Sequence, residues 1–518
     1  MNLKINREPI KFSETICTCS QEQSVELDYV LPDYCPEIFR IVKCCAEPSI
    51  TACTALGDRI SYELTVCLRI IYCTEGSTQP LSVEQKLVYN RTVNTDCRCD
   101  AASVYITACT DHINCRAVNS RRIDVRGAVT VSVRASGEKE TEVVGEAFGG
   151  GIQLKKVSRP CPSGIIRAQK RVTVSDEFDI GSDAPSIGTI IRAEAQVIST
   201  DKKLIAEKAA AKGELKISVV YTSPENDEND PPVHTMQFTL PFSQLIDLEG
   251  MDDAYDCRIN TSVISCEITP RSDGDGNSRR AECEILLFID CVAVKMSMYD
   301  IVCDEYSTSY ATTHTGVPVK IAKDTVSLDC PVTVKGICES HDSPLSVIYD
   351  CWCSTSGLKA AVTNSEVTVS GKAVFSVMGR TENGDMVICT ADVSVDETLA
   401  CEASELSEAA EIKAVFSVLS CGYNFTSDNT AEVKAEIALR GWITDYDTVE
   451  AITEITLDEE SVSEKHDDSA LRLYFADKGE TLWEISKKYG AVISRVIEEN
   501  ELDSDVLSQK RMLLIPTE

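Results

Sequence analysis

The chain has 518 residues, with 50 Lys and Arg against 83 Asp and Glu, which gives a formal net charge of −33. This acidic excess argues against nucleic acid or an anionic membrane surface as a partner, because their phosphate groups would be repelled. No run of apolar residues approaches the roughly eighteen that a membrane-spanning helix needs, so we expect no membrane span. The length alone predicts about three to five domains.

The 25 cysteines are many for a chain whose start, M-N-L-K-I-N-R-E-P-I-K-F-S-E, lacks the apolar core of a signal peptide. We therefore expect a cytoplasmic protein. Many cysteines occupy positions where a strand would carry Val or Ala, such as Cys67, Cys109 and Cys283. A reduced thiol behaves there as a small apolar side chain, so we expect buried free thiols and no disulfide framework.

Residues 1 to about 455 alternate between apolar and polar with a period of two and are rich in Val, Ile, Thr and Tyr. The runs at 60–72 and 121–133 are good examples of this pattern, which is typical of β-strands. Helical periodicity is scarce, although residues 36–43 could form a turn or two. The fold class is therefore predicted to be mainly β.

Two kinds of segment recur along this β-rich part. P-E-I-F-R-I-V from Pro36 resembles P-S-I-G-T-I-I from Pro185 and, more loosely, P-L-S-V-I-Y from Pro344. S-R-R-I-D-V at 120 matches S-R-R-A-E-C at 278, and T-A-E-V-K-A-E-I at 430 takes the same place. A strand follows each proline segment, from Gly57, Gly213 and Gly371, at intervals of 156 and 158 residues. The sequence predicts three tandem antiparallel β domains, sandwich- or barrel-like.

Glycine-rich, weakly periodic and charged stretches suggest the domain boundaries. Three glycines at 149–151 mark a first junction, a stretch of low periodicity at 301–316 a second, and a charged run at 457–469 a flexible tether. We therefore place β domains at 1–148, 152–302 and 303–455, an acidic linker at 456–471 and a small C-terminal module at 472–518. Within the second domain, 223–232 should be an exposed loop and 273–277 a hairpin turn. Proteases should cut first near 149–151 and within 457–469.

The C-terminal module, from Tyr474 to Pro516, is predicted to be a strand, two short helices and a returning strand. Thr481 and Glu484 form a capping box at the first helix, and Gly490 is placed to end it in a left-handed cap. Ser494 is a plausible N-cap of the second helix, which should end at Asn500. Four residues are expected to be core only: Tyr474, Leu482, Ile485 and Leu513.

These landmarks resemble the LysM domain, a β-α-α-β module with the pattern Y-x-V-x-x-G-[DE]-T-L-x-x-I-[AS]-x-x-Y, then N-x-L, then L-x-I-P. One departure is Lys510-Arg511, where the family usually has Gly-Gln. In carbohydrate-binding members, this loop and the Gly-Glu-Thr-Leu loop flank a groove for N-acetylated sugars. The candidate binding residues lie on those loops and the helix flank: Lys478, Gly479, Glu480, Thr481, Trp483, Lys487, Gln509 and Lys510.

Trp483 is expected to be the strongest of these candidates. It follows the buried Leu482 by one residue, so part of its ring should face outward as an interface anchor. The alternative is that Trp483 only covers the local core. Lys478, Lys487 and Lys488 surround it with positive charge, which would suit an acidic patch on a partner.

Tandem β repeats with P-x-I-x-x-I and R-R-I-D-V segments, followed by one C-terminal LysM, resemble the SipL family of SPOCS-domain spore coat morphogenetic proteins. The resemblance implies a non-enzymatic scaffold in the mother-cell cytoplasm at the forespore surface. Its LysM would bind stage IV sporulation protein A, the ATPase of the coat basement layer, and its β domains would recruit other spore coat proteins. The alternative is a LysM protein that binds peptidoglycan or chitin-type N-acetylglucosamine polymers. An enzyme merely tethered by the LysM is a third, more distant hypothesis.

No constellation of residues indicates catalysis. The five histidines are scattered, and there is no Walker sequence, no G-x-S-x-G and no dinucleotide fingerprint. Cys-x-Cys pairs at 17/19, 97/99 and 351/353 could face a soft metal, but structural zinc sites use C-x₂₋₄-C spacing and four ligands, which favours thiols lining a strand. Asp273, Asp275 and Asn277 resemble part of a calcium loop without its final glutamate and favour a simple turn. We predict no catalytic residue, no metal and no cofactor.

Overall fold

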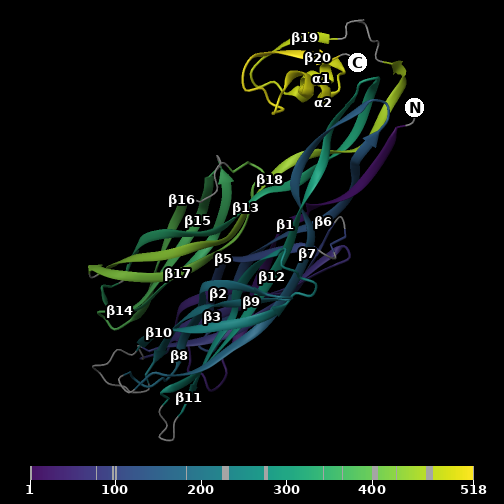
Figure 1. The fold of residues 1–518 in the computed structure, drawn as a ribbon. Helices are drawn as coiled ribbons and strands as arrows, with labels where there is room; N and C mark the ends of the chain where they lie inside the picture. Colours follow the sequence, from purple (N-terminus) through teal and green to yellow (C-terminus); the bar gives the residue numbers. More distant parts are fainter. Residues whose placement is uncertain are drawn as a thin grey trace.

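The computed structural model describes residues 3–76, 79–95, 98–99, 102–181, 184–223, 233–272, 278–341, 343–363, 366–399, 406–427, 429–462 and 471–516. The turn predicted at 273–277 lies outside these residues, as does the loop predicted at 223–232 apart from Ser223. The described chain is dominated by antiparallel strands, with two short helices near its C-terminal end (Figure 1). The predicted mainly-β fold class is confirmed.

Among the residues that the structure describes, eighteen strands form three repeats of six. The first repeat holds β1 (Lys4–Val30), β2 (Arg40–Leu56), β3 (Arg59–Cys73), β4 (Pro80–Asn94), β5 (Ser103–Asn119) and β6 (Arg122–Phe148). The second holds β7 (Ile152–Asp179), β8 (Ile190–Ile205), β9 (Lys208–Thr222), β10 (Val233–Asp247), β11 (Tyr255–Arg271) and β12 (Arg280–Ser307). The third holds β13 (Tyr310–Glu339), β14 (Leu345–Thr363), β15 (Glu366–Thr381), β16 (Met386–Leu399), β17 (Glu411–Ser427) and β18 (Thr430–Val462).

Every repeat has the same topology of two three-stranded sheets. One sheet has the order first–sixth–fifth strand, and the other has the order second–third–fourth. Alternating apolar side chains of the two sheets meet in one core, for example Leu64 and Val66 of β3 with Val129 and Val131 of β6. Each repeat is therefore a β-sandwich, the first of the two architectures expected.

The ends of the strands differ from the domain boundaries that the glycine-rich and polar stretches predict. β12 continues to Ser307, so the boundary placed at 302/303 falls inside a strand, and β18 covers residues 456–462 of the expected linker. The repeats begin at Lys4, Ile152 and Tyr310, which gives intervals of 148 and 158 residues. Gly57 lies in the turn between β2 and β3, whereas Gly213 lies inside β9, so these two glycines are not counterparts. Residues 36–43 form no helix, because β2 already begins at Arg40.

The recurring sequence segments have a shared structural role, which is to fasten the loop that crosses from one sheet to the other. In the first repeat, Ile38 N donates to the Ser120 carbonyl at 2.7 Å, and in the second, Ile187 N donates to the Ser278 carbonyl at 2.7 Å. Both isoleucines are buried. The P-x-I and S-R-R motifs thus meet in space and join the crossing loop to the start of the sixth strand.

Two side chains strengthen each of these joints. The Tyr72 hydroxyl donates to the Pro36 carbonyl at 3.3 Å, and the Tyr221 hydroxyl donates to the Pro185 carbonyl at 3.2 Å. An arginine also binds this loop, and in the second repeat Arg279 donates to two loop carbonyls at 2.8 Å each. Arg121 does the same in the first repeat.

The three repeats close into a ring. β4 contacts β8, β10 contacts β14, and β16 contacts β2, so the fourth strand of each repeat lies against the second strand of the next. These contacts cover sheet edges that would otherwise offer unpaired backbone groups. Each third strand contributes to one apolar cluster where the repeats meet, through Ile71, Val220 and Met378.

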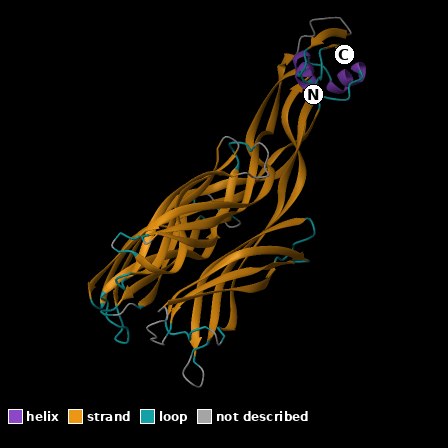
Figure 2. Cartoon of the chain, turned by 90° about the vertical axis from the view of Figure 1, so that its left-hand side faces the viewer, coloured by secondary structure: helices purple, strands orange, loops and turns teal. Residues whose placement is uncertain are grey.

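The first and sixth strands are the longest, at 27 to 33 residues. They pair as β1/β6, β7/β12 and β13/β18 and run past the sandwiches towards the C-terminal module (Figures 1 and 2). The three ribbons pack around a second shared core, whose buried members are Ile10, Phe12, Val143, Cys161, Ile301, Val319, Ile321, Val449 and Ala451. The repeats therefore share apolar cores at two places.

The C-terminal module consists of β19 (Leu471–Ala476), α1 (Leu482–Tyr489), α2 (Ile493–Asn500) and β20 (Arg511–Pro516). β19 and β20 pair antiparallel, and the helices cover one face of this hairpin. In the described part of the chain, neither helix is long and apolar enough to span a membrane.

Candidate functional site

The C-terminal module forms as its sequence predicts at most landmarks. Thr481 is the N-cap of α1 and accepts a hydrogen bond from Glu484 N at 3.1 Å, and Gly490 ends the helix with a φ of 60°. Leu482, Ile485 and Leu513 are buried in the module's core. The expected N-cap at Ser494 is wrong: α2 begins at Ile493 after an extended Val492, which leaves the Ser494 side chain exposed on the helix.

The two loops that flank the helix start are joined by backbone hydrogen bonds. Gly479 N donates to the Leu507 carbonyl at 2.9 Å, and Leu507 N donates to the Glu480 carbonyl at 3.0 Å. Leu482 N donates to the Asp505 carbonyl at 2.8 Å. These are the loops that border the sugar groove in carbohydrate-binding LysM domains, and here those backbone groups pair with one another.

Among the loop residues predicted to bind, some serve the module's own structure. The Glu480 carboxylate accepts from the Tyr474 hydroxyl at 2.9 Å and from Asp477 N at 2.8 Å, which fixes the turn, and Thr481 is the helix cap. The others are exposed, and Lys510 forms an ion pair with Asp477 at 2.6 Å. The exposed residues are Lys478, Gly479, Gln509 and Lys510.

Trp483 does not face solvent, so the expectation of an outward ring is wrong. Only 4% of the residue is exposed, because α1 lies against the end of β12. The indole Nε1 donates to the Asp304 carboxylate at 2.7 Å, and the ring meets that of Tyr306 edge-on with centroids 5.0 Å apart. Trp483 thus joins the module to the second repeat.

The end of β12 forms a docking site for α1, which we call the LysM seat and define as Asp304, Tyr306 and Thr308. Lys487 Nζ lies 2.6 Å from the second Asp304 carboxylate oxygen. The Tyr306 hydroxyl donates to the Ala491 carbonyl at 2.7 Å, just beyond α1. The Thr308 carbonyl lies close to Gly490, where an added Cβ would be 3.9 Å away.

The environment of the seat shifts two pKa values. Burial alone would raise the pKa of Asp304, but hydrogen bonds from Lys487, Trp483 and the backbone of Glu305 outweigh it and hold that pKa below its usual range. Burial raises the pKa of Tyr306 to about 12. At neutral pH the seat therefore presents a carboxylate to α1 and keeps Tyr306 as a hydroxyl donor.

The sequence offers one signal for the seat. Asp304, Tyr306 and Thr308 alternate in D-E-Y-S-T, as residues on one face of a strand do. That stretch carries little apolar periodicity, which favours a domain boundary instead, and no local pattern identifies which distant element covers it.

A second surface of the module has no counterpart among the predicted site residues. The outer face of the β19/β20 hairpin, which we call the hairpin face, is apolar throughout. Cross-strand partners lie on the same side of a sheet, and the pairs here are Leu471–Pro516, Leu473–Leu514 and Phe475–Met512. Phe475 is 76% exposed, and Leu471, Leu473 and Met512 are exposed as well. In the run L-R-L-Y-F-A, apolar residues occur at both odd and even positions. Because alternate residues of a strand face opposite sides, this pattern could have revealed a strand with two apolar faces.

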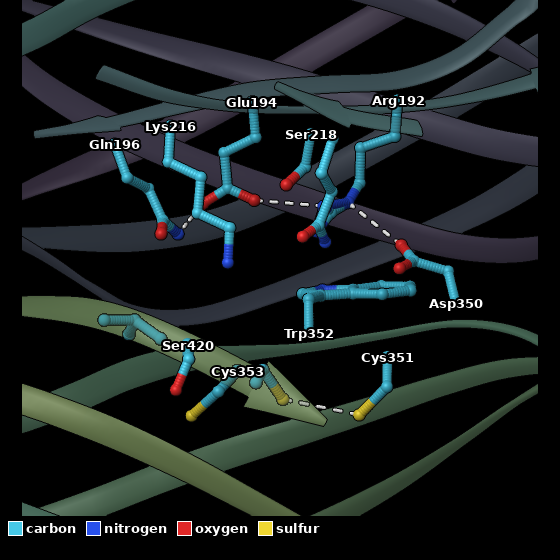
Figure 3. Close-up of a pocket in the computed structure, with 13 residues that line it drawn as sticks. Arg192, Glu194, Gln196, Lys216, Ser218, Asp350, Cys351, Trp352, Cys353 and Ser420 are labelled. Atoms are coloured by element: carbon cyan, nitrogen blue, oxygen red, sulfur yellow. Dashed lines mark hydrogen bonds and ion pairs between the residues drawn. The ribbon is translucent and has the colours of Figure 1, made fainter. Parts of the chain in front are cut away.

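The repeats contain a small polar pocket between the second and third repeats (Figure 3). Buried Arg192 lies 3.0 Å from the Glu194 carboxylate, 3.7 Å from that of Asp350, and 4.8 Å from the centre of the Trp352 ring. The pocket encloses about 30 Å³, which is room for about two water molecules and far less than a small-molecule site needs. It is a joint between repeats.

A larger hollow of about 310 Å³ lies between the first and third repeats, and its lining residues include no histidine or cysteine. Among the residues that the structure describes, no three His, Cys, Asp or Glu side chains are arranged to hold a metal ion. The candidate site is therefore the C-terminal module, with one face docked on the LysM seat and the hairpin face exposed.

Comparison with protein families identifies two domains in the chain. The family model described as SipL, SPOCS domain matches residues 186–270, which span the crossing loop and β8 to β11 of the second repeat. The model of the LysM domain matches residues 477–516. No curated protein and no solved structure matches the chain. The chain thus carries a SPOCS domain of the SipL type and a C-terminal LysM domain, which is consistent with a SipL-like protein.

Proposed function

We propose that this protein is a non-enzymatic scaffold of spore coat assembly that acts in the mother-cell cytoplasm at the forespore surface. Its LysM domain binds stage IV sporulation protein A, and its β repeats recruit other coat proteins. The family matches support the link to sporulation. The first and third repeats act as further SPOCS domains, a proposal supported by their strand order, which is that of the matched repeat.

The observation that carries the proposal is the hairpin face. A contiguous exposed apolar surface on a folded domain usually marks a binding site for another protein. Exposed cationic side chains of Lys478, Lys510 and Arg511 lie in or beside the same hairpin, in a chain that is otherwise strongly acidic. The complementary partner surface is an apolar patch with an acidic rim.

Binding of peptidoglycan or chitin-type polymers has less support. It rests on the LysM fold alone, while the loops that border the family's sugar groove pair their backbone groups with each other. The aromatic ring of Trp483 is committed to Tyr306 and Asp304.

Phe475→Asp tests the proposal, because it places a charge at the most exposed position of the hairpin face without touching the module's core. We expect binding to purified stage IV sporulation protein A to weaken at least tenfold, because the loss of an interface anchor typically costs about 2 kcal/mol of binding free energy. Phe39→Asp is the matched control, since Phe39 is 68% exposed and lies in the first repeat. Unchanged binding by Phe475→Asp, or micromolar binding of chitin oligomers by the parent protein, would contradict the proposal.

A further inference from the structure

Two cysteine sulfurs lie close together between the two sheets of the third repeat. Cys351 is on β14 and Cys421 is on β17, and their Sγ atoms are 3.3 Å apart. β14 belongs to the second–third–fourth sheet and β17 to the first–sixth–fifth sheet. A bond between these sulfurs would therefore connect the two layers of the sandwich.

Both thiols are accessible to a small oxidant. Each residue is half-buried, and each lines the pocket between the second and third repeats, beside Cys353 and opposite Lys216 and Ser218 (Figure 3). The pocket has room for about two water molecules. Hydrogen peroxide, which is little larger than water, fits such a space, whereas a protein reductase or oxidase does not.

The same strands carry a cysteine pair in the first repeat. Cys44 on β2 and Cys115 on β5 share a hydrogen bond that raises the pKa of Cys44 and lowers that of Cys115. β2 and β5 are again the second and fifth strands and belong to different sheets. Inter-sheet thiol pairs thus occur on the corresponding strands of two repeats.

We propose that Cys351 and Cys421 are a redox-active pair that forms an inter-sheet disulfide when the protein meets a peroxide. The hydrogen bond between the two thiols and burial together raise the pKa of Cys351, which keeps that thiol protonated, and Cys421 is the attacking nucleophile in the proposed reaction. The Cys421 thiolate attacks one peroxide oxygen, the O–O bond breaks, and the sulfur becomes a sulfenic acid while hydroxide takes up a proton to leave as water. Cys351 then loses its proton and attacks that sulfur, which forms the S–S bond and releases the second water. Two thiols lose two electrons and two protons, and one peroxide is reduced to two waters.

The disulfide would close a segment of 70 residues and tie β14 to β17 beside the joint with the second repeat. Constraining a loop of this length stabilises a folded domain mainly by restricting its unfolded chain. The folded third repeat would then be more stable in oxidising surroundings than in reducing ones.

The test treats the full-length reduced protein with hydrogen peroxide, blocks the remaining thiols and identifies linked peptides by mass spectrometry. We expect a Cys351–Cys421 peptide as the main product and an unfolding temperature raised by roughly 5–10 °C. Reduction of the unfolded protein with dithiothreitol, followed by refolding, should reverse this shift. Cys351→Ser and Cys421→Ser should each lose the peptide and the shift. Cys353→Ser, two residues away on the same strand, is the matched control and should keep both.

Because the parent protein alone yields the linked peptide, the result does not depend on whether the variants fold. Recovery of both thiols unlinked after peroxide treatment would overturn the proposal. A Cys421 that links as readily to Cys353 or Cys389 as to Cys351 would overturn it too.

Discussion

At the scale of single residues, Asp304 decides how the LysM domain is held. Its two carboxylate oxygens accept from Trp483 at 2.7 Å and from Lys487 at 2.6 Å, so one side chain binds two positions of α1. The sequence predicts Trp483 as an outward-facing anchor and Lys487 as a contact for an acidic patch on a partner. It cannot show that such a surface lies within the chain itself, 179 residues from Trp483.

Asp304→Ala should release α1 from the LysM seat, because it removes two charge-assisted hydrogen bonds, each worth about 1.5–3 kcal/mol. We expect amide hydrogen exchange across residues 482–490 to accelerate at least tenfold while β19 and β20 exchange as before. Asp300→Ala is the matched control, since Asp300 is exposed on the same strand and bonds only to Ser158 among the interactions described for it. Equal exchange in the Asp304 variant and the parent would show that the seat does not hold the module.

The same contact should depend on pH with a defined sign. The pKa of Asp304 is lower in the docked state than in the free carboxyl, so the docked state binds fewer protons. Docking is therefore fully stabilised above about pH 4, the ordinary carboxyl value, and weakens as the pH falls through the lowered pKa. Hydrogen exchange of α1 followed from neutral to acid pH should show this loss in the parent and not in Asp304→Asn.

At the scale of elements, the recurring motifs are joints between a loop and a strand. The alternation of side chains is sufficient to predict the strands, and the P-x-I and S-R-R segments are sufficient to detect three copies. The sequence does not show that these segments contact each other, because Ile187 and Ser278 are 91 positions apart. They are joined in the structure by the hydrogen bond from Ile187 N to the Ser278 carbonyl. Gly57 also leads to a wrong alignment of the first repeat with the others, because a glycine in a turn and a glycine in a strand look alike in sequence.

Arg279→Ala should destabilise the second repeat by about 2 kcal/mol, because the guanidinium donates to the Gly181 and Ala184 carbonyls of the crossing loop. Arg280→Ala is the control at the next position, where an exposed ion pair with Asp179 at 3.5 Å should contribute less than about 1 kcal/mol. Denaturant unfolding followed by fluorescence would measure both. Equal losses from the two variants would mean that the joint adds no stability beyond an ordinary surface arginine.

At the scale of the whole molecule, the three sandwiches form a closed ring with two shared apolar cores. The sequence predicts three separate β domains, sandwich- or barrel-like. It does not reveal the contacts between them, because core residues that face another repeat alternate along a strand just as those that face the repeat's own second sheet do. Three consecutive glycines at 149–151 predict early proteolysis there. The packing predicts slow cleavage instead, since Gly150 is buried against the Leu457 and Tyr310 side chains.

Ile321→Ala should loosen all three repeats, because Ile321 of β13 packs in the core that β1, β6, β7 and β12 also build. A buried isoleucine truncated to alanine costs about 2–5 kcal/mol. We expect faster hydrogen exchange around Ile10 and Ile301 as well as in β13. Val369→Ala is the control, since Val369 is buried in the third repeat's own core, and its effect should stay in that repeat. Confinement of the Ile321 effect to the third repeat would favour independent domains.

We propose that the LysM domain recruits the coat ATPase to the ring of β repeats. The direct measurement compares the full-length chain with a chain that ends at Val462 for equilibrium binding to purified stage IV sporulation protein A. We expect clear binding by the full-length chain and at least a hundredfold loss of affinity in the shortened chain, with the unfolding of the β repeats unchanged. Binding by the shortened chain within twofold of the full-length affinity would contradict it.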